Sequence, residues 1–111
     1  MAQDHAASGE PIDIRPLGAG LADQVTTAIM KSAQLELVRL VLPSGKAMRE
    51  HRVVGEITVQ CIEGLIEFTT PAGSRRLGPG QLIHLQGGEP HALLALEEST
   101  ALLTICLAAP A

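Results

Sequence analysis

Glycine and proline punctuate this sequence in a pattern that favours many short strands. They recur at intervals of roughly eight to twelve residues, and the segments between them are rich in Val, Ile, Leu and Thr, as in Leu35–Leu42 and residues 101–107. Short runs of β-forming residues bounded by turn residues are typical of sandwiches and barrels. The spacing therefore predicts an all-β protein.

The length and composition indicate one domain with an aliphatic core. The chain has 111 residues, of which 46% are hydrophobic, and it contains no Trp, no Tyr and a single Phe. This is enough sequence for one buried core but not for two. We expect residues 1–11, which are small and polar, to form a flexible tail and residues 12–108 to form the domain.

Charge and segment patterns exclude several classes of partner. A net charge of −4 and the near absence of aromatic residues argue against a nucleic-acid surface. No apolar window is long enough to cross a membrane, and the first residues lack the pattern of a signal peptide. Cys61 and Cys106 lie in apolar runs, where free core thiols are expected. Together these features favour a cytoplasmic protein.

Three local expectations concern the connections. Residues 12–15 alternate apolar and polar side chains, which predicts a short edge strand ended by Pro16. Residues 17–23 are expected to form a glycine-rich loop, and no helix is needed. Residues 65–70 are expected to pair back across Gly64 as a hairpin.

Two stretches share an order of glycines, apolar residues and a histidine. In the first, five residues separate Gly45 from His51, and the stretch closes on Gly64. In the second, Gly80 opens an apolar run that leads to Gly88 and His91. Two histidines at the ends of β segments make a candidate site.

The spacing within these stretches resembles the two motifs of the cupin superfamily. The resemblance covers residues 45–95, about half of the chain. It implies a cupin-type double-stranded β-helix, also called a jelly-roll barrel, in a small single-domain member similar to the RmlC-like cupins. In the family the motif histidines and a glutamate hold a divalent metal. The resemblance therefore implies His51 and His91 as metal ligands.

The sequence departs from the family motifs in ways that lower the number of metal ligands. Val53 stands where a second histidine of the first motif would be, and Ile57 stands where the glutamate would be. Gln86 and Ala95 replace the proline and the asparagine of the second motif. Two imidazoles alone hold Zn, Ni, Fe or Mn weakly, because stable sites use three or four protein ligands.

His84 is a candidate third ligand, because it lies seven residues before His91 on the preceding strand. Strand parity alone does not decide whether it faces the interior, since a bulge at Gly87 and Gly88 would change the face. Glu56 is one residue away from the family's glutamate position, so it points away from His51 unless the strand is bulged.

Two functions follow as hypotheses. The first is binding of a small molecule in an aliphatic pocket, lined by Met48, Val53, Ile57 and Val59, with His51 and His91 at its polar end. The second is a metal-dependent cupin enzyme of the dioxygenase or isomerase type, with one divalent metal on the histidines. The long apolar strands also predict a homodimer.

Overall fold

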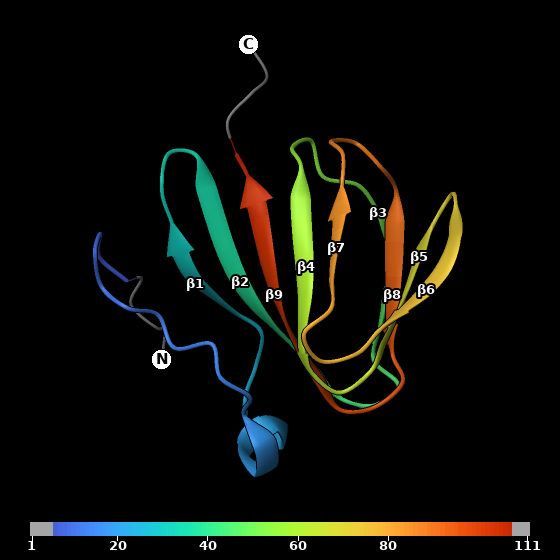
Figure 1. Ribbon diagram of the computed structural model, residues 1–111, viewed down its shortest axis with the longest axis horizontal. Helices are drawn as coiled ribbons and strands as arrows, with labels where there is room; N and C mark the ends of the chain where they lie inside the picture. Colours follow the sequence, from blue (N-terminus) through green and yellow to red (C-terminus); the bar gives the residue numbers. More distant parts are fainter. Residues whose placement is uncertain (1–5, 108–111) are drawn as a thin grey trace.

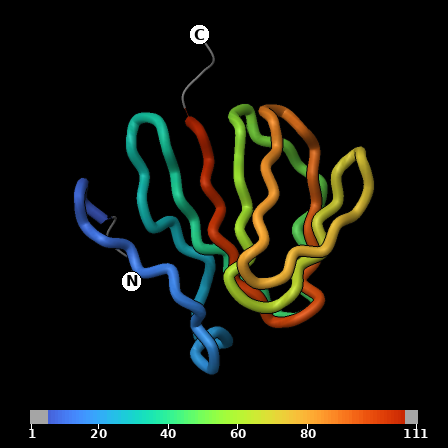
Figure 2. Tube along the Cα trace, viewed as in Figure 1, coloured from blue at the N-terminus to red at the C-terminus, as the bar shows by residue number. Residues whose placement is uncertain are grey.

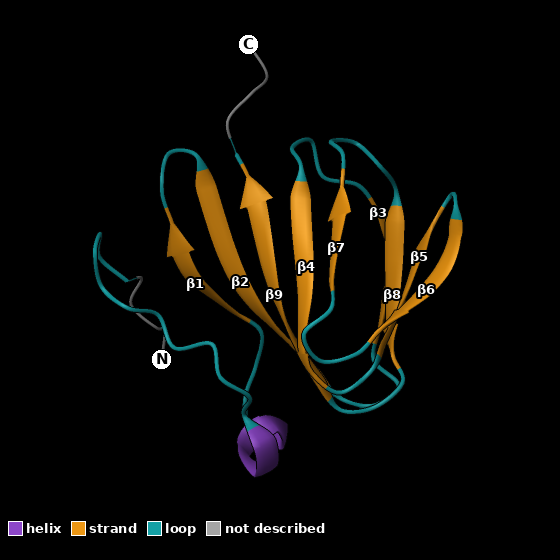
Figure 3. Ribbon diagram, in the orientation of Figure 1, coloured by secondary structure: helices purple, strands orange, loops and turns teal. Residues whose placement is uncertain are grey.

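The computed structural model describes residues 6–107 and folds them into nine strands and one short 3-10 helix (Figure 1). In chain order the elements are η1 (Gly18–Asp23), β1 (Thr27–Lys31), β2 (Leu35–Leu42), β3 (Ala47–His51), β4 (Ile57–Glu63), β5 (Ile66–Thr70), β6 (Gly73–Leu77), β7 (Leu82–Leu85), β8 (His91–Ala95) and β9 (Ser99–Cys106). Figure 3 shows that strands provide nearly all of the regular structure. The prediction of an all-β protein is confirmed.

The strands form two antiparallel sheets that enclose one core. The first sheet has the order β1-β2-β9-β4-β7, and the second has the order β3-β8-β5-β6. Consecutive strands often lie in different sheets, as β2 and β3 do and as β4 and β5 do. In Figure 1 the two sheets stand apart at the upper end and converge at the lower end. This is the jelly-roll arrangement of a double-stranded β-helix.

The core is formed by alternate side chains of both sheets. In β4 the buried positions are Ile57, Val59 and Cys61, whereas the residues between them are only half-buried. Phe68 on β5 is the largest of the fully buried side chains. The buried cluster comprises Leu40, Leu42, Ile57, Val59, Cys61, Ile66, Phe68, Leu77, Leu85, Leu93, Ala95 and Ala101. With one aromatic member, it is the aliphatic core that the composition predicts.

The corner at Gly64 differs from the predicted hairpin. β4 pairs with β7 and β9, whereas β5 pairs with β6 and β8, so the two strands on either side of Gly64 do not pair with each other. Gly64 has a φ of +89°, and the chain crosses here from the first sheet to the second (Figure 2). The hairpin prediction was wrong because a glycine between two strands indicates a turn without specifying which strands pair.

The segment before β1 also departs from expectation. Residues 12–15 form no strand, because the carbonyl oxygens of Asp13 and Arg15 accept hydrogen bonds from the Arg39 guanidinium, at 2.7 and 3.0 Å, in place of a neighbouring strand. The predicted loop at residues 17–23 contains the helix η1. Residues 1–5 of the predicted tail and residue 108 of the predicted domain lie outside the described residues.

The N-terminal segment, residues 6–17, lies along the outer side of β1 and β2. The Ala6 amide donates to the Ile29 carbonyl of β1 at 3.2 Å. Ile29 and Val41 are buried although they do not belong to the core cluster between the sheets. The N-terminal segment is therefore what covers these two side chains.

Glu63 fastens the end of this segment to β4. Its carboxylate accepts hydrogen bonds from the amides of Leu17 and Gly18, at 2.8 and 3.0 Å, and from the Thr100 hydroxyl at 2.7 Å. Burial raises the pKa of the Glu63 carboxyl, but these donors and the charge of Arg39 outweigh burial, so the pKa is lowered from its ordinary value. The folded state therefore favours the charged carboxylate.

A Glu63→Gln variant is expected to lose about 1–2 kcal/mol of unfolding free energy at neutral pH, because hydrogen bonds to a charged group are replaced by bonds to a neutral amide. A group whose pKa is lowered by folding stabilises above its unfolded pKa, near 4.3, and this stabilisation is lost as the pH falls through the folded value. The difference between variant and parent should therefore shrink below about pH 4. Urea unfolding followed by far-UV circular dichroism across this pH range checks it.

Glu67→Gln is the matched control, since its ion pair with Arg76 is long, at 3.9 Å, and partly exposed. A Glu63→Gln variant that unfolds at the same urea concentration as Glu67→Gln at neutral pH would contradict the role of Glu63 as a fastening.

The described residues contain no helix with the length and hydrophobicity needed to cross a bilayer.

Candidate functional site

Two neighbouring strands of the second sheet bring His51 and His91 together. His51 is the last residue of β3 and His91 the first residue of β8, and the antiparallel register places them directly opposite each other. The pairing is irregular between Met48 and His51, so a bulge adjusts β3 just before the histidine. The two residues, far apart in the sequence, therefore meet at one end of the barrel, as predicted.

The two imidazoles form a compact pair. Their ring centroids are 4.3 Å apart, and the ring planes are tilted by 59°. His91 is buried, with 4% of its surface exposed, whereas His51 is exposed to solvent. The ring of His91 stacks on Phe68, with centroids 5.6 Å apart and planes within 11°. The pair thus has an inner imidazole fixed by packing and an outer imidazole at the mouth.

Backbone carbonyls determine which nitrogen of each ring carries the proton. Nδ1 of His51 lies 2.9 Å from the Arg49 carbonyl oxygen, and Nδ1 of His91 lies 3.1 Å from that of Glu89. A carbonyl oxygen only accepts hydrogen bonds, so each Nδ1 is the donor. In the neutral form each Nε2 then carries a lone pair. Among the described residues neither Nε2 has a hydrogen-bond partner.

Two loops complete the rim beside the histidines. The loop between β3 and β4 contacts the loop between β7 and β8, both at the upper end of Figure 1. The Gly88 amide donates to the Val53 carbonyl at 2.8 Å, and any side chain at Gly87 would overlap the Val54 carbonyl. This loop therefore needs glycine at position 87, because another backbone passes close by.

The four residues predicted to line a pocket all pack in the cluster beneath the pair. Ile57 and Val59 are buried members of the core. Met48 and Val53 are half-buried and pack against it. The polar pair therefore borders an aliphatic interior.

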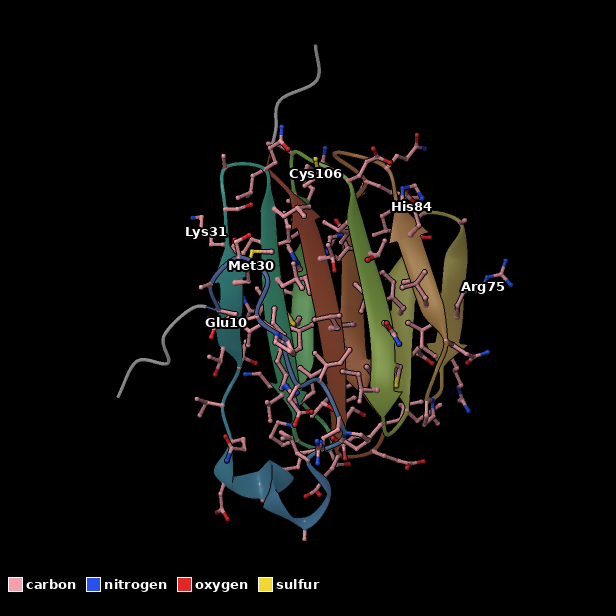
Figure 4. The ribbon with its side chains drawn as sticks, turned by 60° about the vertical axis from the view of Figure 1, so that its left-hand side comes forward. Glu10, Met30, Lys31, Arg75, His84 and Cys106 are labelled. Carbon is pink, nitrogen blue, oxygen red and sulfur yellow. The ribbon has the colours of Figure 1, made fainter. Side chains whose placement is uncertain are left out.

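His84 lies away from this pair. It is on β7 in the first sheet, next to the buried Leu85, and its own side chain is 55% exposed. Its Nε2 lies 2.8 Å from the Glu56 carboxylate, so the outward-facing Glu56 partners His84 rather than His51. Figure 4 shows His84 at the outer side of the barrel. The strand alternation continues through β7, so the structure does not bring His84 to the proposed metal site.

The donor set does not fit a divalent metal held by the protein alone. Within residues 6–107 no three His, Cys, Asp or Glu side chains gather closely enough to ligate one ion. Ile57, at the position of the family's glutamate, is 3% exposed and apolar. Zinc sites use three or four protein ligands, and the non-haem iron triad needs a carboxylate. The structure offers two imidazole nitrogens.

Sequence reasoning missed two supports of the site. One is the stacking of Phe68 on His91, and the other is the pair of backbone carbonyls that fix the tautomers. The first had a signal, since Phe68 is the one aromatic residue of the chain and lies in an alternating strand. The second depends on backbone geometry at the strand ends and leaves no mark in the sequence.

Comparison with solved structures identifies the fold. The chain is similar to a conserved protein of unknown function from Streptococcus pyogenes, with a TM-score of 0.74 and 22% identity over 99% of this chain and 97% of that one. It is similar to a cupin superfamily protein from Desulfitobacterium hafniense, with a TM-score of 0.74 and 15% identity over 87% and 94% of the two chains. It is also similar to an RmlC-like cupin with a double-stranded β-helix fold from Methanocaldococcus jannaschii, with a TM-score of 0.73 and 13% identity over 90% and 93%. No protein-family model and no curated protein matches the sequence.

Proposed function

We propose that this chain, which has the cupin double-stranded β-helix fold, binds a small and mainly apolar molecule whose polar end carries hydrogen-bond donors. The observation that carries the proposal is the orientation of the two imidazoles. Both Nδ1 atoms donate to backbone carbonyls, so the paired rings offer two acceptors to a ligand.

The chemistry of the pair selects the polar end of the ligand. Neutral imidazoles with Nδ1–H groups accept at Nε2, and a hydroxyl, an ammonium or an amide N–H satisfies such acceptors. A carboxylate brings only acceptors and would bind only after a ring gained a proton. The aliphatic side chains of Met48, Val53 and Ile57 suit the apolar part of the ligand.

Binding of matched probes tests this proposal. We expect 1-hexylamine and 1-hexanol to shift the imidazole resonances of His51 and His91 at about pH 8, and hexanoate to shift them far less. A His51→Ala, His91→Ala double variant, followed through backbone amide resonances near these positions, should bind hexylamine at least about tenfold more weakly. His84→Ala is the control and should behave as the parent protein. Equal responses to hexanoate and hexylamine would refute the assignment of the two acceptors.

The alternative function is a metal-dependent enzyme of the dioxygenase or isomerase type. Two free Nε2 atoms on adjacent residues favour it, and water or substrate would have to supply the other ligands. We expect the protein purified without chelator to hold well below one Zn, Ni, Fe or Mn per chain, because two imidazoles bind such ions weakly. Stoichiometric metal that is lost in the His51→Ala, His91→Ala variant would favour the enzyme.

The outer face of the first sheet supports a homodimer as part of the proposal. Leu35 and Leu82 on this sheet are 41% and 57% exposed, and a second copy that covered them would remove this apolar surface from water. Sedimentation at micromolar concentration should give a dimer, and Leu82→Glu should convert it to a monomer. A monomeric parent protein would contradict this part of the proposal. A reducing cytoplasm remains the expected location, in keeping with the buried free thiol of Cys61.

A further inference from the structure

A cavity lies outside the barrel, between the N-terminal segment and the outer side of β1 and β2. Its volume is about 650 Å³, and its lining includes Pro11 and Ile12 from the segment and Ile29 and Val41 from the strands. Neither His51 nor His91 lines it. Cavities of this size hold small organic ligands in other proteins. The outer cavity is thus separate from the histidine pair.

The walls of the outer cavity are fixed at several points. Its floor is formed by Ile29 and Val41, which are 7% and 6% exposed. Its roof is held by Ala6 at one end, by the hydrogen bonds of Arg39 in the middle, and by Glu63 beyond Leu17 at the other end. Figure 4 shows Glu10 of the segment beside β1 and His84 on β7, at the opposite edge of the same sheet.

One cation in the lining has donors to spare. Arg39 donates one N–H from Nη1 to the Arg15 carbonyl and one from Nη2 to the Asp13 carbonyl, and a guanidinium has five N–H groups. Among the described residues no carboxylate forms an ion pair with Arg39, whereas Asp13 is paired with Arg15 at 2.8 Å. The charge of Arg39 also acts on the carboxyls of Asp13 and Glu63, but neither makes a direct ion pair with it, so its remaining N–H groups favour a carboxylate ligand.

We propose that the outer cavity binds a small amphipathic carboxylic acid. The carboxylate accepts hydrogen bonds from the Arg39 guanidinium, and the aliphatic or aromatic body lies on Ile29 and Val41. Glu10 and Asp13 also line the cavity, and their negative charges oppose such a ligand. Removal of a negative charge from the lining should therefore raise the affinity for the carboxylate, which can be tested.

Hexanoate is the probe, with uncharged hexanamide as its matched partner, and backbone amide resonances report where each binds. We expect hexanoate to give saturable shifts at residues 12–15, 27–29 and 39–41, and hexanamide to bind at least about tenfold more weakly. Glu10→Gln removes a like charge and keeps an oxygen for the Ala7 amide that Glu10 accepts from. It should tighten hexanoate binding by about two- to threefold.

Two further variants complete the test, one that fills the outer cavity and one that removes the histidine pair. Thr27 lines the cavity, so Thr27→Phe should occupy the space and abolish the shifts, while Thr69→Phe on the exposed surface of β5 should leave them unchanged. The His51→Ala, His91→Ala variant should bind hexanoate in the outer cavity as the parent does. Absence of saturable shifts with hexanoate, equal affinity for hexanamide, or weaker binding by Glu10→Gln would each overturn the proposal.

Discussion

Replacing Gly64 by alanine is expected to cost at least about 3 kcal/mol of unfolding free energy. Gly64 has a φ of +89°, and this backbone conformation alone costs a residue with a Cβ about 1–2 kcal/mol. The added Cβ would also overlap Ser99 Oγ and the Glu98 carbonyl oxygen. A backbone carbonyl cannot move aside as the end of a flexible side chain can.

The surroundings of Gly64 explain why relaxation cannot relieve this overlap. Ser99 is fully buried, and its hydroxyl accepts from the Leu65 amide at 3.0 Å and donates to the Glu97 carbonyl at 2.8 Å. The same hydroxyl lies 3.3 Å from the Leu65 carbonyl. The corner between the two sheets is therefore bonded to the start of β9, and any shift breaks buried hydrogen bonds.

Gly80→Ala is the matched control for this prediction. Gly80 has a similar φ of +85°, but a Cβ there would meet no atom within 4 Å, so only the conformational cost of about 1–2 kcal/mol applies. Far-UV circular dichroism in urea measures both variants, since the chain has no Trp or Tyr for fluorescence. If Gly64→Ala is no less stable than Gly80→Ala, the close approach at this corner does not exist in solution.

Phe68→Ala is the second large effect, with an expected loss of about 3–5 kcal/mol. Phe68 is fully buried in the core cluster, and truncation leaves a cavity that a rigid barrel cannot close. Because domains of this size are stable by only about 5–15 kcal/mol, the variant should be close to unfolding at room temperature. Urea unfolding of the two proteins gives the difference.

Phe68→Leu separates packing from positioning. Leucine restores much of the volume, so this variant should lose clearly less stability than Phe68→Ala. It cannot provide the flat face on which His91 stacks at 5.6 Å. The His91 ring resonances should therefore broaden or shift in Phe68→Leu while the His84 resonances stay unchanged. Unaltered His91 resonances would show that the stacking does not fix the ring.

The sequence predicted strands better than it predicted their partners. Leu35–Leu42 is a strand with the predicted bounds, because a strand and its ends depend on local residue preference and on Pro43. The hairpin at Gly64 was wrong, because partner choice depends on which sheet buries each face. The strand expected at residues 12–15 was wrong because a distant side chain, Arg39, takes two of its carbonyls.

In the candidate site, too, the features that depend on local sequence were predicted, and those that depend on distant contacts were not. The glycine and histidine spacing led to the His51 and His91 pair, since His51 ends one strand and His91 begins the strand that pairs with it. His84 remained undecided because one bulged residue would have turned it inward, and the structure has it outward with Glu56. The tautomers, which determine the kind of ligand, depend on the positions of two backbone carbonyls. No residue type in the sequence indicates these positions.

The central claim is that His51 and His91 together present two free Nε2 acceptors at the mouth of an aliphatic barrel. Imidazole ¹⁵N correlation spectra recorded at about pH 8 test this claim most directly, because they show which nitrogen of each ring carries the proton. We expect both rings to carry the proton on Nδ1, and hexylamine to shift the two Nε2 resonances together. A proton on Nε2 of either ring, or an amine response at His84 alone, would contradict it.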